Sequence, residues 1–514
     1  KNVSILENLL YWIHKRDCKL KYNNEVTWDW RRRMRDVIGD DLETNLPITS
    51  NTPLLVIDDE CDHASVDTYN QFLREGDPDL DHEPTRTNMM IRRLLFAYEK
   101  SAYIGYTATP FANIFIERRG ETTQEGIDLW PRDFIINLPT PSQYIGPSQV
   151  FFDPDDEDEV QGIINYGYIN NISDHAKWTF VDGEWKIHRR EREGWMPPLH
   201  DLNHTPLYNG LGEIPPSLKK AVCLFLIGCA VRYLRGYDEG NTMLVHVSRF
   251  VAVSRRVGDQ VMSYINSLKA SLIGNESEFS FIKTIWNENH AEKINENNNI
   301  PNTIVDYASV EKVIYELLDL NKFDIGLMNG FAEDKADYDR KLRAKCNIIT
   351  IGGQRLSRGL TLKSLIVSYF LRSAQSPLTD TMTQMGRWFG YRVGYEDLCR
   401  LFIPSDLEKH FREFAETETN LRKRIEDMGD KGKTPEDYVM MLERHPGWQI
   451  TSRARLRKTR TIQIDYNNYH GQTVVLHKKT ENKKNINATA TFLLKLGKPV
   501  TGRKKGNHYL WKDI

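Results

Sequence analysis

The sequence predicts an α/β protein with two parallel-sheet lobes, the first incomplete at its N-terminus, plus an insertion and a helical and then basic C-terminal extension. Short apolar runs of strand length alternate with longer segments whose apolar residues recur at helical spacing. Polar motifs follow directly after several of these runs, where the active sites of parallel sheets gather. At 514 residues, the chain has room for about three or four domains, placed at residues 1–120, 121–215, 216–404 and 405–514.

The composition is that of an ordinary globular protein, with 40% hydrophobic and 27% charged residues. Six cysteines are scattered without CxxC or Cys/His spacing, which favours reduced thiols over a disulfide framework or a structural zinc site. No apolar run approaches the ~20 residues of a membrane span, and no secretory signal is visible. We therefore expect a cytoplasmic protein without a membrane partner.

The first lobe is predicted from three kinds of element. An amphipathic helix opens the chain at residues 1–14, because its apolar residues recur at helical spacing. The apolar runs at residues 52–58 and 102–110 predict buried strands, and the segment 86–101 between them predicts a helix. Strand, helix and strand with polar motifs at the strand ends is the pattern of a parallel sheet.

The composition changes between residues 121 and 215, and we interpret this segment as an insertion or linker. Proline is frequent there, and FFDPDDEDEV at residues 151–160 is an acidic run typical of a solvated loop. WTFVDGEWKIH at residues 178–188 predicts a small hairpin.

Regular alternation resumes after residue 215 and predicts the second lobe. Helices are expected at residues 216–235, 250–273 and 309–320. Strands are expected at residues 242–248, 323–330, 346–353 and 364–371. Helices then dominate from about residue 405 to 445.

The last 64 residues are strongly basic. Residues 451–514 carry fifteen Lys and Arg against three Asp and Glu, a net charge of +12. A strand pair is predicted within them at residues 460–466 and 472–478. A solvated lysine-rich tail and a footprint for a nucleic-acid phosphate backbone both fit this composition. In the second case the candidate contacts are Arg455, Arg457, Lys458 and Arg460.

LLVIDDECDHAS, residues 54–65, places four carboxylates at the end of the first predicted strand. There Asp59 would hold a hydrated Mg²⁺ that bridges two phosphates, and Glu60 would orient or deprotonate an attacking water. Asp62 would couple this site to the next motif. An acidic cap on a strand is common, so the pattern alone is not specific.

The next motif is TAT in YTATPFAN, which puts the hydroxyls of Thr107 and Thr109 at the end of the neighbouring strand. Hydroxyls at that position would hydrogen-bond the carboxylates next door. A plain turn before Pro110 would give the same residues.

Two further motifs lie in the second lobe. GGQRLSRGLTL, residues 352–362, combines glycine, hydroxyl and arginine in a way suited to gripping phosphate oxygens. QMGRWFGYR, residues 384–392, offers Arg387 and Arg392 as guanidinium groups to insert against a γ-phosphate. Taken singly, either motif would also fit surface arginines.

In this order, the motifs resemble those of superfamily-two helicases and translocases over roughly residues 1–405. DECD is similar to motif two, TAT to motif three, SRGLT to motif five and QMGR with YR to motif six, while TMLVHVS lies where motif four belongs. The resemblance implies two RecA-like lobes, with ATP and Mg²⁺ as cofactors. It implies coupling by Asp62, Thr107, Thr109 and Gln384, and contacts to nucleotide or nucleic acid by Ser248, Gly353, Ser357, Arg358 and Gly359.

More narrowly, LLVIDDECDHAS, IGYTATPFANIFI and IGGQRLSRGLTL resemble the Z-one (Z1) domain family. These bacterial proteins are labelled endonucleases and described as helicase-associated. The family context implies a restriction or phage-defence system, with DNA and other subunits of that system as partners. The chain departs from the motif-six pattern at Thr383 and in the spacing of its final arginine, and from motif five at Thr361.

The phosphate-binding pattern G-x-x-x-x-G-K-[ST] is missing from the chain. GK[ST] occurs at Gly432, Lys433 and Thr434, but Asp427 replaces the first glycine and a helix rather than a strand is predicted to precede it, ending at Gly429. We interpret this segment as a turn between helices. The phosphate loop is expected upstream of Lys1, so that the chain as given binds ATP poorly.

Three functions remain open from the residues. The first is an ATP-driven nucleic-acid motor. The second is a metal-dependent endonuclease, in which Asp58, Asp59, Glu60 and Asp62 gather two metal ions, although no strand-borne D…[DE]-x-K arrangement accompanies them. The third is a helicase-like scaffold that docks a partner through its insertion. The ordered motifs and the basic tail favour the motor.

Overall fold

The structure is a computed structural model. It describes residues 3–18, 53–68, 84–116, 121–122, 126–151, 167–181, 184–187, 190–271, 276–289, 305–328, 332–352, 361–372, 379–437 and 479–496. The chain divides into two compact units, residues 1–459 and 460–514. All of the elements below except α14 belong to the first unit.

In the second unit the structure describes helix α14 (Lys479–Leu496). Its apolar residues Ile486, Phe492 and Leu494 are exposed. The sequence did not predict this helix, because lysines and asparagines obscure its helical period. The strand pair predicted at residues 460–466 and 472–478 lies outside the described residues.

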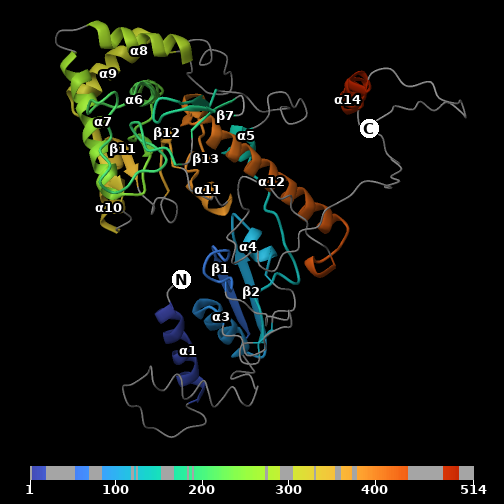
Figure 1. The fold of residues 1–514 in the computed structure, drawn as a ribbon. Coiled ribbons are helices and arrows are strands. Elements are labelled where there is room, and N and C mark those ends of the chain that lie inside the picture. Colours follow the sequence, from blue (N-terminus) through green and yellow to red (C-terminus); the bar gives the residue numbers. More distant parts are fainter. Residues whose placement is uncertain are drawn as a thin grey trace, which may run out of the picture. The chain divides into compact units, whose positions relative to one another are not determined.

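The predicted first lobe contains a two-stranded parallel sheet, called here the first sheet. It consists of β1 (Leu54–Asp59) and β2 (Ser101–Tyr106), with Asp59 opposite Tyr106 at the carboxyl end. Helices α1 (Val3–Cys18) and α3 (Arg86–Phe96) pack together beside it through a small apolar core (Figure 1). Helix α3 ends five residues before the predicted boundary, and a short helix, α4 (Phe111–Ile114), follows β2.

The predicted second lobe contains a six-stranded sheet in the order β10-β11-β9-β12-β14-β6, and each neighbouring pair is parallel. Its strands are β6 (Ile169–Asn171), β9 (Thr242–His246), β10 (Phe323–Met328), β11 (Asn347–Gly352), β12 (Leu365–Phe370) and β14 (Arg400–Ile403). The four predicted strands are present, whereas β14 and β6 were not predicted. The chain is thus a mixed α/β protein with a six-stranded parallel sheet, consistent with a Rossmann or RecA-like lobe.

Helices cover both faces of this sheet, which is why its strands are nearly continuous apolar runs. Met243 and Ile349 face a large core shared with four helices, while Leu244 and Ile348, one residue along each strand, face α10. The helices are α6 (Pro216–Leu234), α7 (Val251–Ser271), α9 (Tyr307–Asp319) and α10 (Ala332–Arg343), with α8 (Glu276–Asn289) packed against α6 (Figure 1).

Helix α6 is the most deeply buried helix among those described. Thirteen of its residues are buried, including AVCLFLIGCAV, which the sequence predicted as a buried helix. Pro216 begins it, where a missing N–H costs nothing. Gly228 lets it approach β12, since an added Cβ would lie 2.9 Å from Cγ2 of Ile366.

The segment predicted as an insertion supplies several small elements. Its β6 extends the six-stranded sheet, and the predicted hairpin is present as β7 (Thr179–Val181) and β8 (Glu184–Lys186). Strands β3 (Glu121–Thr122) and β4 (Gly126–Ile127) pair with each other. The acidic run lies outside the described residues, apart from Phe151.

Two other elements of this segment reach the motif-six region. Strand β5 (Tyr144–Ile145) pairs antiparallel with β13 (Gly390–Tyr391), which lies just after α11 (Thr379–Met385). Helix α5 (Pro147–Phe151) packs on the long helix α12 (Ser405–Asp430). The segment therefore contributes directly to the surroundings of Arg387.

The glycine-rich segment after α12 is a helix end, as predicted. The helix stops at Asp430, one residue beyond the expected boundary, and Gly432 has a left-handed φ of 62°. The amides of Gly432 and Lys433 donate to the carbonyls of Gly429 and Met428. Because these amides cap helical carbonyls, they cannot at the same time cradle a phosphate.

In the described part of the chain, no helix has the length and apolar character needed to cross a membrane.

Candidate functional site

Asp59 and Glu60 lie at the carboxyl end of β1 with exposed side chains. The backbone N–H of Glu60 donates to Oδ1 of Asp59 over 3.0 Å. Glu60 itself has a φ of 52°, in the left-handed region that non-glycine residues seldom adopt. Such a conformation costs of order 1–3 kcal/mol and is held by the surrounding structure, often at functional sites.

The neighbouring Asp58 is buried and faces a different set of partners. Its Oδ2 accepts from the hydroxyls of Ser65 at 2.6 Å and Tyr103 at 2.7 Å. Burial, and after it the hydrogen bond to Asp58, raises the pKa of Tyr103, so the phenol remains a donor. Asp58 therefore ties β1 to β2 and to the loop after β1.

Asp62 joins the first two sequence motifs. Its carboxylate is 1% exposed and accepts from Oγ1 of Thr107 at 2.9 Å and Oγ1 of Thr109 at 3.2 Å. The N–H of Thr109 donates in turn to Oγ1 of Thr107. The structure thus brings together the carboxylate and both hydroxyls that the sequence placed on neighbouring strands.

One cavity of about 920 Å³ collects residues from both predicted lobes. Glu60, Asp62 and Thr109 line it from the segments that follow β1 and β2, and Gln384 and Arg387 line it from α11 and the turn after it. Nε2 of Gln384 lies 3.5 Å from Oγ1 of Thr109, at the long limit of a hydrogen bond. The volume is in the range of small-molecule binding sites.

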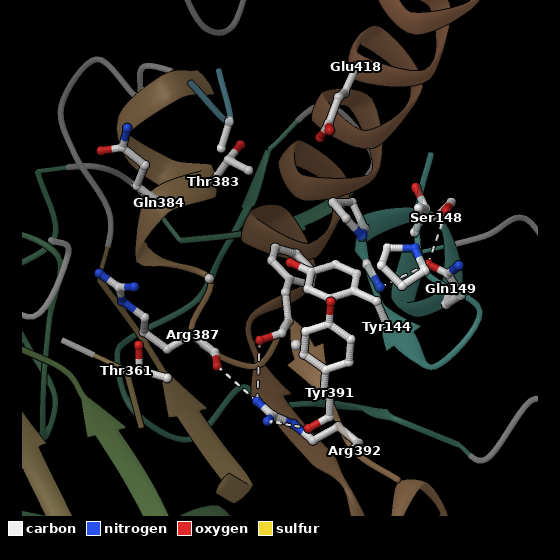
Figure 2. A pocket seen from close by; sticks show the side chains of 18 of the residues that line it. Tyr144, Ser148, Gln149, Thr361, Thr383, Gln384, Arg387, Tyr391, Arg392 and Glu418 are labelled. Atoms are coloured by element: carbon white, nitrogen blue, oxygen red, sulfur yellow. Dashed lines mark hydrogen bonds between the residues drawn. The ribbon is translucent and has the colours of Figure 1, made fainter. Parts of the chain in front are cut away.

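Arg387 lines this cavity together with Glu60 and Asp62. Burial lowers the pKa of its guanidinium, and the negative charge of Glu60 acts in the opposite direction. In Figure 2 its guanidinium extends to the same side of the site as Gln384. A half-buried guanidinium that shares a cavity with an exposed carboxylate is an arrangement suited to an anionic ligand that carries a cation.

Arg392, the other finger candidate, has a different environment. Its side chain is 6% exposed, and its Nη2 donates to the backbone carbonyls of Arg387, Trp388 and Phe389 at 3.2–3.3 Å. Nη1 donates to the carbonyl of Tyr391 at 3.1 Å. The dashed lines of Figure 2 show the guanidinium turned toward its own loop. Arg392 thus holds the turn that carries Arg387.

Several cavity residues were missed by the sequence analysis. The rings of Tyr144 and Tyr391 meet edge to face, with centroids 5.5 Å apart. Gln149 and Glu418 line the same cavity (Figure 2), as does Arg422. Burial, and after it the charge of Glu418, raises the pKa of Tyr144. Strands of two residues have no readable period, so no sequence signal marks β5 or β13.

The remaining predicted contacts fall into two groups. Ser248 is buried after β9, where its Oγ accepts from the N–H of Phe250 and lies 2.8 Å from Nε2 of His200. It does not line the cavity of Glu60. The other group lies outside the described residues and comprises Gly353, Ser357, Arg358, Gly359, Arg455, Arg457, Lys458 and Arg460.

The donor set fits a hydrated magnesium ion better than a protein-enclosed metal. Among the described residues, no group of three or more His, Cys, Asp or Glu side chains is placed to hold a metal. Mg²⁺ usually takes one or two carboxylates and completes its shell with water and phosphate oxygens. The exposed carboxylate of Asp59 meets that requirement.

Comparison with known proteins gives one match. Residues 217–449, somewhat less than half of the chain, match the family model of the Z1 domain. This range runs from α6 through α12 and so includes Arg387, but it leaves out β1 and β2 with Asp59 and Glu60. No curated protein and no solved structure matches the chain.

Proposed function

We propose that the chain belongs to a superfamily-two-like ATPase that translocates on DNA within a restriction or phage-defence protein. In this proposal the first sheet and the six-stranded sheet belong to two RecA-like lobes. ATP and Mg²⁺ are the cofactors, and DNA and other subunits of the system are the partners.

The observation that carries the proposal is the shared cavity. Glu60 and Arg387 are 327 positions apart in the sequence, yet both line it. Glu60 is also the charged side chain that stabilises the Arg387 guanidinium. A phosphoryl-transfer site built between two lobes needs this pairing of a water-activating carboxylate with an opposing guanidinium.

The residues in and beside the cavity have separate roles in this scheme. Asp59, which precedes Glu60 but does not itself line the cavity, would hold Mg²⁺, which neutralises charge on the phosphates when bound. Glu60 would orient and deprotonate the attacking water, and Arg387 would stabilise the charge of the transition state. Asp62, Thr109 and Gln384 form the hydrogen-bonded link by which closure of the two lobes would be sensed.

The alternative of a two-metal endonuclease has weaker support. It requires Asp58, Asp59, Glu60 and Asp62 to converge, but Asp58 and Asp62 accept hydrogen bonds from hydroxyls on β2 and the turn after it. A two-metal site needs shared carboxylates at about 3.5–4 Å metal spacing.

The decisive experiment is ATP hydrolysis by the protein at its natural length, with Mg²⁺ and with and without DNA. Glu60→Gln removes the base but keeps the shape of the side chain. It should therefore lower the hydrolysis rate by about 10²–10⁴-fold and leave ATP binding unchanged. Undiminished hydrolysis in this variant, or none in the wild type, would overturn the proposal.

Glu99→Gln is the matched control. Glu99 is exposed near the opposite end of the first sheet, just before β2, so the same charge is lost away from the cavity. Its hydrolysis rate should equal that of the wild type. A parallel assay of Mg²⁺-dependent plasmid cleavage separates the alternatives, since cleavage that disappears in Asp59→Ala would favour the endonuclease.

A further inference from the structure

A second group of charged residues lies at the carboxyl edge of the six-stranded sheet, outside the cavity of Glu60. Strands β9 and β12 are neighbours there, with His246 opposite Phe370 and the N–H of Leu371 donating to the carbonyl of His246. Arg249 follows β9 by three residues and Arg372 follows β12 by two. Both arginines therefore emerge from adjacent strand ends.

His246 contacts Arg372 and is uncharged. Its ring is 1% exposed, and Nη1 of Arg372 lies 3.3 Å from its Nε2. Since a guanidinium can only donate, Nε2 is the acceptor and the proton lies on Nδ1. Burial, and after it the charges of Arg372 and Arg387, lowers the pKa of His246 to about 3. The imidazole thus does not compete for an anion.

The two arginines repel each other. Burial lowers the pKa of Arg372, and the positive charge of Arg249 lowers it further. Within the described part of the chain, neither guanidinium has a carboxylate partner. Arg372 is partly buried and Arg249 is exposed beside it, and two neighbouring like charges without a counter-ion are unfavourable unless a ligand supplies one.

The surroundings of Arg249 suit an anion as well. Its guanidinium lies 4.7 Å from the centroid of the Phe250 ring, which restrains it. Helix α7 begins at Val251, so its N-terminal amides lie at the same edge of the sheet.

We propose that Arg249 and Arg372 bind a phosphate group of a nucleic-acid backbone at the carboxyl edge of the six-stranded sheet. Guanidinium groups match phosphate oxygens through paired N–H donors. Neither arginine lines the cavity in which ATP is proposed to bind. The exposed position of Arg249 leaves the site open to a polymer. The identification of the phosphate as a backbone phosphate rests on the proposed function, whereas the anion site itself does not.

The test is equilibrium binding of a fluorescent oligonucleotide to the full chain without nucleotide, over a series of salt concentrations. Arg372→Gln and Arg249→Gln should each weaken binding roughly tenfold to a hundredfold. Each should also reduce the slope of log K against log salt by about one, because one phosphate contact is lost. Arg372→Lys keeps the charge but not the paired donors, so it should retain the slope and lose part of the affinity.

Arg343→Gln is the matched control, because Arg343 is exposed at the end of α10, near the amino edge of the same sheet. It removes an equal charge and should leave binding unchanged. Arg249 is exposed, so its substitution tests the site even if Arg372→Gln does not fold. Equal binding by the Arg249 variant and the wild type, an equal loss in the control, or no oligonucleotide binding by the wild type would overturn the inference.

The rate of ATP hydrolysis in the absence of DNA distinguishes failure of the phosphate site from failure of the proposed ATPase function. If the variants lose oligonucleotide binding but keep wild-type basal hydrolysis, both proposals stand. If the wild type binds oligonucleotide through these arginines but hydrolyses no ATP, the phosphate site stands and the motor does not. If ATP affinity falls in the variants and oligonucleotide affinity does not, the phosphate belongs to the nucleotide and the backbone assignment is overturned.

Discussion

The two sheets differ in how they are buried and in which charges they carry. The strands β9, β11, β12 and β14 are buried along their whole length, whereas Leu55 and Ile57 of β1 are 55% and 63% exposed. The carboxylates Asp59 and Glu60 lie at the carboxyl end of the first sheet. Arg249 and Arg372 lie just after strands of the six-stranded sheet. Parallel sheets are normally covered on both faces, so the first sheet is the less protected of the two.

This difference teaches where stability and chemistry reside. The six-stranded sheet and its helices form a large apolar core that fixes the turn of Arg387 and the strand ends of Arg249 and Arg372. The first sheet has a small core around Leu10, Met90 and Leu94. We therefore expect the arginine side to be a rigid platform and the carboxylate side to open more readily.

The largest expected effect comes from Arg387, which joins the two regions. If it stabilises the transition state, Arg387→Lys should lower ATP hydrolysis by about 10³–10⁵-fold, since a single ammonium cannot replace the planar fork. Thermal stability should change little, because the side chain is only half-buried. Steady-state hydrolysis by the protein at its natural length, together with a melting curve, measures both quantities.

Arg392 supplies the contrast to that experiment. Its donors go to carbonyls of the turn that carries Arg387, so Arg392→Lys should lower hydrolysis through the position of Arg387 and also lower the melting temperature. A melting temperature equal to that of the wild type, with hydrolysis lost completely, would instead identify Arg392 as the finger.

Much of the fold follows from the sequence because its elements are long and apolar. AVCLFLIGCAV and the runs around Met243, Ile349 and Val367 give strong signals, and the observed elements follow them within a few residues. Strand β14 was missed because LCRLFIP is short and contains a buried arginine, Arg400. Strand β6 was missed because INN lacks any apolar period and gains its place through pairing with β14.

The site was predictable to the extent that each motif lies at the end of a strong strand. The contact of Asp62 with Thr107 and Thr109 follows from parallel strands that end at one edge. The sequence could not show whether Arg387 or Arg392 is the finger, because the motif-six spacing departs from the usual pattern. The distinction depends on which guanidinium donates to backbone carbonyls, and in the structure this is Arg392. Arg372 carries no motif at all, and only the pairing of β9 with β12 brings it to His246.

A matched pair of isoleucines tests the difference in burial directly. Ile349 in β11 is fully buried, and Ile57 in β1 is 63% exposed. Ile349→Ala should lower the free energy of unfolding by about 2–5 kcal/mol, whereas Ile57→Ala should change it by less than about 0.5 kcal/mol. Urea unfolding, combined with hydrogen exchange of peptides from β1 and β11, measures the two effects. Equal destabilisation would mean that the exposed face of β1 is covered in solution.

Low pH should lower the free energy of unfolding of the six-stranded region, by less than Ile349→Ala does. The difference in stability between the two sheets should then become smaller. Burial lowers the pKa of His175, four residues after β6, to about 3, and burial with nearby positive charge does the same for His246. Between pH 6.5 and 3, these two histidines are therefore protonated in the unfolded chain but neutral in the folded protein. The free energy of unfolding falls as the pH drops through this range.

At pH 5 each buried histidine should cost about 2 kcal/mol relative to pH 7. The measurement is the free energy of unfolding in urea at several pH values between 5 and 7. His175→Asn should reduce its slope against pH by about one proton, because the unfolded state of the variant no longer gains that charge. An unchanged slope would show that His175 is protonated in the folded protein, and the region around β6 would then be as open to water as the first sheet.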